Sequence, residues 1–207
     1  SRPDTRCFAV YNGTPARVVT PQVSIVHFPN LLGQEQGLWP WAFKTARDLG
    51  ADWCAIIHDD LFLLSDGWED ELERASASYR IGVAGWAAYA DLVRCPNRVT
   101  IAAARGGPAA VVDGCGLVFN MRVFDERSCF TTLTARCGLG DMEASLYSLS
   151  KGWINWQLAA SSHHQPVSLD RIPNARRHHQ LGMAEDADLI GQLYGHLVPL
   201  YVTPTGI

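Results

Sequence analysis

The apolar segment Asp52–Ile57 runs directly into His58, Asp59 and Asp60. A buried strand that places carboxylates at its own carboxyl end is typical of open α/β sheets, which bind ligands in the crevice outside the strand ends. Carboxylate oxygens at that position suit Mg²⁺ or Mn²⁺ bound together with a phosphorylated substrate. The segment therefore predicts a layered α/β fold with a ligand site at one edge of its sheet.

The composition is that of one globular domain. The chain has 207 residues, of which 47% are hydrophobic, and this is enough for a single full core. Its formal net charge of -4 argues against a general nucleic-acid binder, which normally carries a strong basic excess. The 6 cysteines include no C-x-x-C pair, which favours buried thiols in a reducing cytoplasm over disulfides. We expect one domain over residues 1–207.

The sequence also predicts that the chain does not cross a membrane. No segment approaches the roughly 18 consecutive apolar residues of a spanning helix. The first residues do not have the pattern of a signal peptide either. We therefore expect a cytoplasmic protein.

Segments with strand-like and helix-like apolar spacing alternate along the chain. Alternation of elements of these lengths predicts an α/β layered fold. The end of the chain, residues 165–207, is expected to form a lid or tail. The expected strands are Cys7–Tyr11, part of Val18–Phe28, Asp52–Ile57, one within Ile81–Ala90 that is followed by a loop, Val111–Val112, Leu117–Phe119 and Trp153–Ala159. The expected helices are Trp39–Leu49 with a cap at Gly50, Trp68–Ala75 after Ser65–Gly67, and one that starts near Asp141 and ends at Gly152.

A series of short motifs follows in a characteristic order. The motifs are Ile57–Asp60, Asp66–Trp68, Asp113-Gly114, Arg122, Phe124–Glu126, Gly140–Glu143 and Gly152. Over about Tyr11–His164, their order and spacing resemble those of GT-A fold glycosyltransferases of the inverting family 2 type. Asp141 lies eleven residues before Gly152, as the catalytic Asp of that family lies before its helix-ending Gly.

The resemblance implies a GT-A, Rossmann-like mixed sheet flanked by helices. It also implies a metal-dependent inverting glycosyltransferase that uses Mn²⁺ or Mg²⁺ to move a sugar from a nucleotide-sugar donor to a hydroxyl acceptor. The acceptor stays open between a saccharide, a natural product and a modified nucleobase. The distance from Phe8 to Asp60 matches the second strand of the family better than its first, so one interpretation is that the first strand is missing.

The resemblance assigns the donor side of the site to the end of the Asp52–Ile57 strand. Asp60 is expected to bind the cation, and His163 or His164 is expected to complete the metal site. Asp59 is expected to face the ribose, or else the backbone. His58 stands where many relatives have an acid, so it either contacts the nucleotide or is a structural group.

The acceptor side is assigned to Asp141 and Glu143. Inverting transfer requires a carboxylate that takes the proton of the acceptor hydroxyl, and Asp141 is the candidate base. The alternative for Asp141 is the N-cap of the helix that follows. Glu143 either holds the acceptor or complements the helix dipole from the first turn. Gly140 replaces the Glu of the family's Glu-Asp pair.

Further nucleotide contacts are expected outside these two groups. Tyr11 and Asn12, at the end of the first expected strand, are candidates for contact with the nucleobase. Arg177 lies in the basic run Arg176–His179, which either contacts the diphosphate as a lid or is a solvated loop.

Two other functions remain open. A nucleotidyltransferase of related fold is one, although the Gly-rich, basic signature of that class is not visible near the start of the chain. A non-catalytic sugar- or nucleotide-binding module is the other, and the Gly at position 140 supports it. A metallohydrolase ranks lower because no H-E-x-x-H helix occurs.

Overall fold

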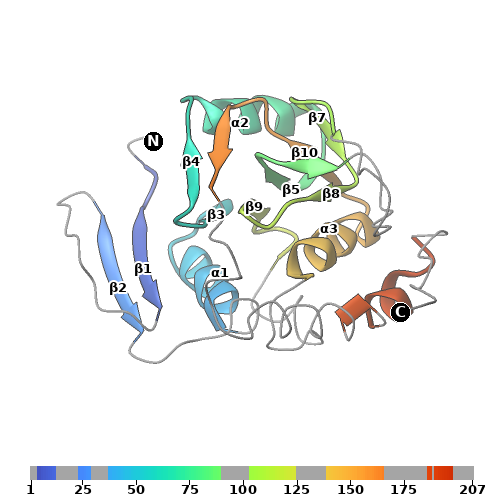
Figure 1. The fold of residues 1–207 in the computed structure, drawn as a ribbon, viewed down its shortest axis with the longest axis horizontal. Coiled ribbons are helices and arrows are strands. Elements are labelled where there is room, and N and C mark those ends of the chain that lie inside the picture. The colour runs from blue at the N-terminus through green and yellow to red at the C-terminus, as the bar shows by residue number, and fades with distance from the viewer. Residues whose placement is uncertain are drawn as a thin grey trace.

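A five-stranded mixed sheet forms the centre of the computed structural model, with helices on both faces (Figure 1). The structure describes residues 4–12, 23–28, 37–89, 103–124, 139–165, 186–187 and 189–197. The sheet has the order β3-β9-β5-β10-β7, in which β3, β5 and β10 run parallel to one another and β9 and β7 run in the opposite direction. Its strands are β3 (Trp53–Ile57), β5 (Ile81–Gly85), β7 (Gly107–Ala109), β9 (Gly116–Asn120) and β10 (Ile154–Gln157). The predicted α/β class is confirmed.

Two hydrophobic clusters lie on opposite faces of this sheet. One contains Phe43 of α1 (Trp39–Asp48), Leu146 of α3 (Gly140–Ser150) and Phe119 of β9. The other contains Leu72 of α2 (Trp68–Ser78) and Val118 of β9. Neighbouring residues of β9 enter different clusters because side chains alternate between the two faces of a strand. The sheet is therefore a middle layer, with α1 and α3 on one face and α2 on the other (Figure 1).

Three pairs of strands lie outside the central sheet. β1 (Phe8–Asn12) and β2 (Ser24–Phe28) form a parallel pair on the left of Figure 1. β4 (Leu61–Leu63) pairs with β11 (Ser162–His164), and β6 (Ala88–Tyr89) pairs with β8 (Val111–Val112), both antiparallel. In the first two pairs, β1 borders a large cleft and β4 follows His58–Asp60 directly.

The glycines predicted to end helices do so. Gly50 and Gly152 have φ angles of 67° and 73° just after α1 and α3, in the left-handed region that glycine adopts without strain. The N-cap residue of α2 is Gly67, and no side chain caps this helix. The hydroxyl of Ser65, two residues earlier, accepts a hydrogen bond from Ser161 N at 2.7 Å.

The expected strands differ from the observed ones mainly in their ends. The segment expected within Val18–Phe28 is described only from residue 23 onward, and the strand expected over Trp153–Ala159 is limited to β10. Most of residues 165–207 lies outside the described part, but Ile190 is 1% exposed and belongs to the core cluster of α1 and α3. In the described part of the chain, no helix combines the length and the apolar character needed to cross a bilayer.

Candidate functional site

The carboxyl end of β3 meets the loop between β8 and β9. His58 N donates a hydrogen bond to Cys115 O at 3.1 Å, so the antiparallel pairing of β3 and β9 extends one residue past the strand end. This pairing places His58–Asp60 next to Asp113–Cys115. Residues from distant parts of the sequence therefore share one edge of the sheet.

The pairing of β4 with β11 brings His164 to Asp60. His164 lies opposite Leu61 in the register, and its Nε2 is 3.4 Å from Asp60 Oδ2. Gln165 N donates to Asp60 O at 2.9 Å and continues the pairing. Asp60 Oδ1 is buried and accepts no hydrogen bond from the described residues. A carboxylate oxygen and an imidazole nitrogen are both donor types that a divalent cation such as Mn²⁺ accepts.

His163, the other predicted metal ligand, is placed differently. Its ring lies beside Phe62, its cross-strand neighbour, with the ring centroids 6.4 Å apart. Among the described contacts, only His164 of the two histidines pairs with Asp60. The structure therefore distinguishes His164 from His163, whereas the sequence offers both equally as metal ligands.

The imidazole of His58 lies among several charged groups. Burial lowers the pKa of His58 below its ordinary value of 6.5, and nearby His164 lowers it further. Asp60, Asp59 and Asp113 oppose this shift, since their negative charges favour the protonated form. Burial prevails, so His58 is mainly neutral at pH 7.

Asp113 is a site residue to which the sequence assigned no role. Its Oδ2 accepts a hydrogen bond from Tyr89 Oη at 3.0 Å, and its Oδ1 accepts one from Cys115 N at 3.1 Å. Burial, together with the charge of Asp113, raises the pKa of Cys115 to about 12, so this thiol stays protonated. The signal that could have identified Asp113 is its place in the glycine-containing loop Asp113–Gly116, which follows a buried strand.

Asp141 lies against the same loop. Its Oδ2 accepts a hydrogen bond from Gly114 N at 3.2 Å, and its Oδ1 accepts one from Met142 N at 2.8 Å. The N-cap of α3 is Leu139, so the alternative that Asp141 caps the helix is wrong. Asp141 instead occupies the first turn of α3, next to the loop that carries Asp113.

Ser145 fixes this end of α3 to the sheet. Its hydroxyl donates to Asp141 O at 2.8 Å and accepts a hydrogen bond from Val112 N at 3.0 Å. Ser145 is completely buried, so water does not compete for either bond. The backbone that carries Asp141 is therefore tied to β8.

Glu143 has a different environment from Asp141. It is 3% exposed and lies in the first turn of α3. Two residues on one helix project about 200° apart, so the two carboxylates do not face the same point. The predicted role of Glu143 in acceptor binding has no support from this placement.

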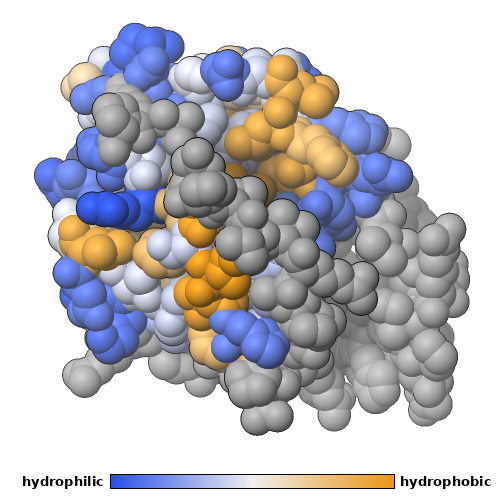
Figure 2. All heavy atoms as spheres, turned by 90° about the vertical axis from the view of Figure 1, so that its left-hand side faces the viewer, coloured by the Kyte–Doolittle hydropathy of each residue, from blue (hydrophilic) through white to orange (hydrophobic). Residues whose placement is uncertain are grey.

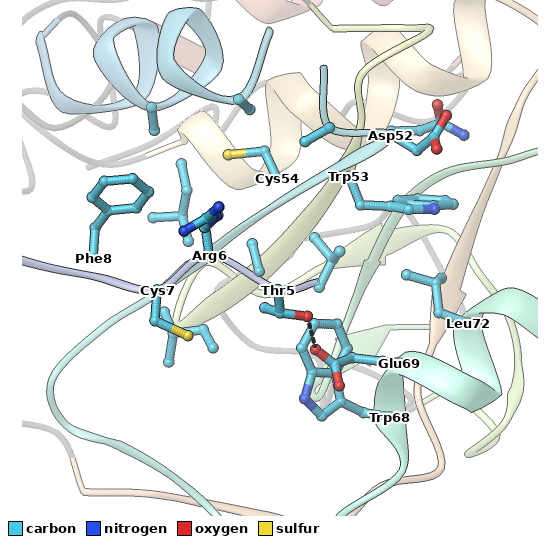
Figure 3. A pocket seen from close by; sticks show the side chains of 18 of the residues that line it. Thr5, Arg6, Cys7, Phe8, Asp52, Trp53, Cys54, Trp68, Glu69 and Leu72 are labelled. Carbon is cyan, nitrogen blue, oxygen red and sulfur yellow. Dashed lines mark hydrogen bonds between the residues drawn. The ribbon is translucent and has the colours of Figure 1, made fainter. Parts of the chain in front are cut away.

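Three of the five predicted nucleotide contacts line a cleft of about 1970 Å³. Tyr11, His58 and Asp59 all line this cleft, which lies between β1, β3, α1 and α2 (Figure 3). The backbone of Asn12 pairs with Phe28 at the end of β1. Arg177 and the rest of the basic run lie outside the described residues.

Asp60 and His164 are the two residues that could hold a divalent cation at this site. The described residues contain no group of three or more His, Cys, Asp or Glu side chains arranged as metal ligands. The chain thus offers one oxygen donor and one nitrogen donor here, and phosphate oxygens and water would have to complete an octahedral shell.

Comparison with known proteins adds no further assignment. The chain matches no protein-family model and no curated protein sequence.

Proposed function

We propose that this protein is a metal-dependent inverting glycosyltransferase of the GT-A type, which transfers a sugar from a nucleotide-sugar donor to a hydroxyl acceptor. One observation supports this proposal above the others. Asp60 and Asp141 are far apart in the sequence but both lie near the loop Asp113–Cys115, since Gly114 N donates to Asp141 Oδ2 and His58, two residues before Asp60, pairs with Cys115. An acid for a cation and an acid for a base are the two groups that this reaction requires.

Asp60 and His164 are the residues that would hold Mn²⁺ or Mg²⁺. Their facing atoms are 3.4 Å apart, and the buried Oδ1 of Asp60 has no hydrogen-bond donor among the described residues. A divalent cation bound there supplies charge neutralisation for the departing nucleoside diphosphate. The neutral imidazole of His58 lies next to this pair and also lines the large cleft, so it can accept a hydrogen bond from a donor hydroxyl without adding charge.

Asp141 would act as the general base. The acceptor oxygen attacks the anomeric carbon, its proton passes to the carboxylate of Asp141, and the bond from that carbon to the phosphate oxygen breaks. Attack from the side opposite the leaving group inverts the configuration. The hydrogen bonds from Gly114 N and Met142 N orient the carboxylate before the acceptor arrives.

A thermal-shift experiment tests the donor side. The chain is melted with UDP, GDP, ADP, CDP or dTDP, each with and without Mn²⁺. At a nucleotide concentration of 100 times Kd, binding adds about 2.7 kcal/mol, which corresponds to a rise in Tm of about 5–10 °C. We expect such a rise with at least one nucleotide, only when Mn²⁺ is present.

The matched variants are His164→Gln and His163→Gln, which make the same change at neighbouring positions. We expect His164→Gln and Asp60→Asn to remove the Mn²⁺-dependent rise and His163→Gln to keep it. The proposal is wrong if no nucleoside diphosphate raises the Tm with Mn²⁺. Binding without sugar transfer, unaffected by Asp141→Asn, would favour a non-catalytic module, and pyrophosphate release from a nucleoside triphosphate would favour a nucleotidyltransferase.

A further inference from the structure

Side chains hold the segment that connects β10 to β11. Ala159 N donates a hydrogen bond to Glu71 Oε1 at 2.7 Å, and Ala160 N donates one to Glu71 Oε2 at 3.3 Å. The next amide, Ser161 N, donates to Ser65 Oγ at 2.7 Å. Two side chains therefore bind three successive backbone N–H groups directly before β11.

Both of these side chains follow β4 closely in the chain. Ser65 lies two residues after β4, and Glu71 lies in the first turn of α2. Leu64 N in turn donates to Ser161 O at 2.8 Å, and Leu158, at the other end of the connecting segment, is completely buried. The start of β11 is thus fixed relative to β4 by residues outside the two strands.

The strands themselves do not specify how they pair. Each has only three residues, and a two-stranded pair is marginally stable by itself. The register of a strand is strongly specified where one of its faces is buried. In β11, however, Ser162 is partly buried and both His163 and His164 are exposed. Since the two exposed residues are both histidines, a shift of one residue would place the same kind of side chain near Asp60.

Contacts around β4 add little discrimination. Leu61 is buried, but Phe62, Leu63 and Leu64 are 49%, 38% and 65% exposed. Figure 2, which views the left-hand side of Figure 1, shows hydrophobic surface exposed between hydrophilic regions. The ring of Phe62 lies beside that of His163, its cross-strand neighbour. In a register shifted by one residue the neighbour of Phe62 would again be a histidine, so this contact does not select between registers.

The bonds to Glu71 can supply this selection. Hydrogen bonds to an ionised group are roughly twice as strong as those between neutral groups. A shift of one residue moves a strand by about 3.4 Å, which exceeds the range of a hydrogen bond. Only Ser161 separates the two bonded amides, those of Ala159 and Ala160, from β11. The connecting segment therefore cannot absorb such a shift without breaking its bonds to Glu71.

We propose that Glu71 sets the register of β11 against β4 and thereby selects His164, rather than His163, as the partner of Asp60. Ser65 supports the same register. Glu71 is a positioning residue, because it acts on the site through the backbone and does not hold the cation itself. The effect on the register is independent of the proposed function, whereas the effect on a bound cation rests on it.

NMR tests the register without metal or nucleotide. In the unmodified chain we expect NOEs between the ring protons of Phe62 and those of His163. In Glu71→Ala, which removes both acceptor oxygens, these NOEs should weaken and NOEs between Phe62 and His164 should appear. The amide of Gln165, which donates to the backbone of the residue before β4, should exchange at least about 10-fold faster.

Two further variants serve as controls. Glu71→Gln keeps one acceptor oxygen, so its effects should lie between those of the unmodified chain and of Glu71→Ala. Glu73→Ala makes the same truncation at an exposed position of α2, which projects about 200° away around the helix. We expect it to leave the NOEs and the exchange of Gln165 unchanged. The amides of the central sheet should stay protected in every variant, which separates a change of register from a loss of the fold.

The affinity for Mn²⁺ tests the selection of the histidine. It is measured with the nucleoside diphosphate that gives the largest thermal shift. With Glu71 present, His164→Gln should weaken Mn²⁺ binding about 10-fold or more relative to His163→Gln. In the Glu71→Ala background this ratio should fall to about 3-fold or less, because either histidine can then reach Asp60. A purely structural role of Glu71 would weaken binding in both histidine variants equally and leave the ratio unchanged.

Three outcomes would overturn the proposal. One is an unchanged pattern of NOEs and an unchanged exchange of Gln165 in Glu71→Ala. Another is an equal effect of Glu71→Ala and Glu73→Ala on these signals. The third is an unchanged ratio between the two histidine variants. Absence of Mn²⁺ binding by the unmodified chain would instead contradict the proposed function, and the NMR measurements would then decide on the register alone.

Discussion

His164 Nε2 lies 3.4 Å from Asp60 Oδ2, whereas the ring of the preceding residue, His163, lies beside Phe62. The side chains of His164 and Asp60 are 39% and 23% exposed. Ion pairs at this level of exposure contribute about 1 kcal/mol or less to stability. The fold therefore does not require this pair, which the register of β4 and β11 brings together.

The first prediction follows from that small contribution. In the absence of metal and nucleotide, His164→Gln should lower the free energy of unfolding by about 1 kcal/mol or less, because it removes only a partly exposed pair. Urea unfolding measures this, with His163→Gln as the matched control. A loss of several kcal/mol would mean that His164 has a structural role and would weaken its assignment as a ligand.

The second prediction concerns the pH dependence of stability that His58 produces. Its folded-state pKa is lowered by burial below the value of 6.5 that it has when unfolded. The unfolded chain therefore binds a proton more readily, and the stability from this group is complete above pH 6.5 and decreases as the pH falls from there toward the lowered pKa. His58→Gln should remove this part of the decrease in urea unfolding between pH 7 and pH 5.

An NMR titration checks the cause of the shift at His58. Asp60 is the charge that most strongly favours protonated His58, so Asp60→Asn should lower the pKa of His58 further. A measured His58 pKa at or above 6.5 in the unmodified chain would contradict the assignment of burial as the main cause.

The third prediction compares two glycines of one loop. A Cβ on Gly116 would lie 2.5 Å from Leu61 Cδ2 and 2.9 Å from Trp86 Cε3, whereas one on Gly114 would meet Asp141 Cβ at an ordinary 3.4 Å. Gly116→Ala should therefore destabilise the protein by about 1–3 kcal/mol through overpacking, and Gly114→Ala by much less. Because Leu61 follows Asp60, we also expect Gly116→Ala to weaken the Mn²⁺-dependent thermal shift. Equal stabilities of the two variants would contradict the packing described here.

The sequence predicted the elements whose signals are local. The apolar run before His58 identified β3 because a buried strand and its terminal acids are adjacent in the chain. Gly50 and Gly152 marked the ends of α1 and α3 because a left-handed residue after a helix favours glycine. Such features depend on a few neighbouring residues, which the sequence lists side by side.

Features that depend on long-range register were not predictable in this way. The choice between His163 and His164 depends on how β11 pairs with β4, and a shift of one residue would exchange their faces. The charge of Asp113 acts on His58 only because the fold brings the loop that carries Asp113 beside the end of β3. The position of β1 and β2 outside the central sheet likewise depends on strand pairing, which alternation of apolar residues does not specify.

The last prediction concerns how Asp141 is positioned, and it uses two buried serines of α3 as a matched pair. Ser145 and Ser148 are both completely buried, but Ser145 bonds to Asp141 O and Val112 N, whereas Ser148 Oγ has no hydrogen-bond partner among the described residues. Ser145→Ala leaves the buried N–H of Val112 unsatisfied and should cost about 1–3 kcal/mol. Ser148→Ala deletes the same atom without losing a bond, so it should be neutral or slightly stabilising. Since Ser145→Ala also removes the link between the first turn of α3 and β8, we expect it to lower kcat of the proposed sugar transfer more than it changes KM. Urea unfolding and steady-state kinetics check both statements, and equal effects of the two serine variants would remove the argument that Ser145 positions Asp141.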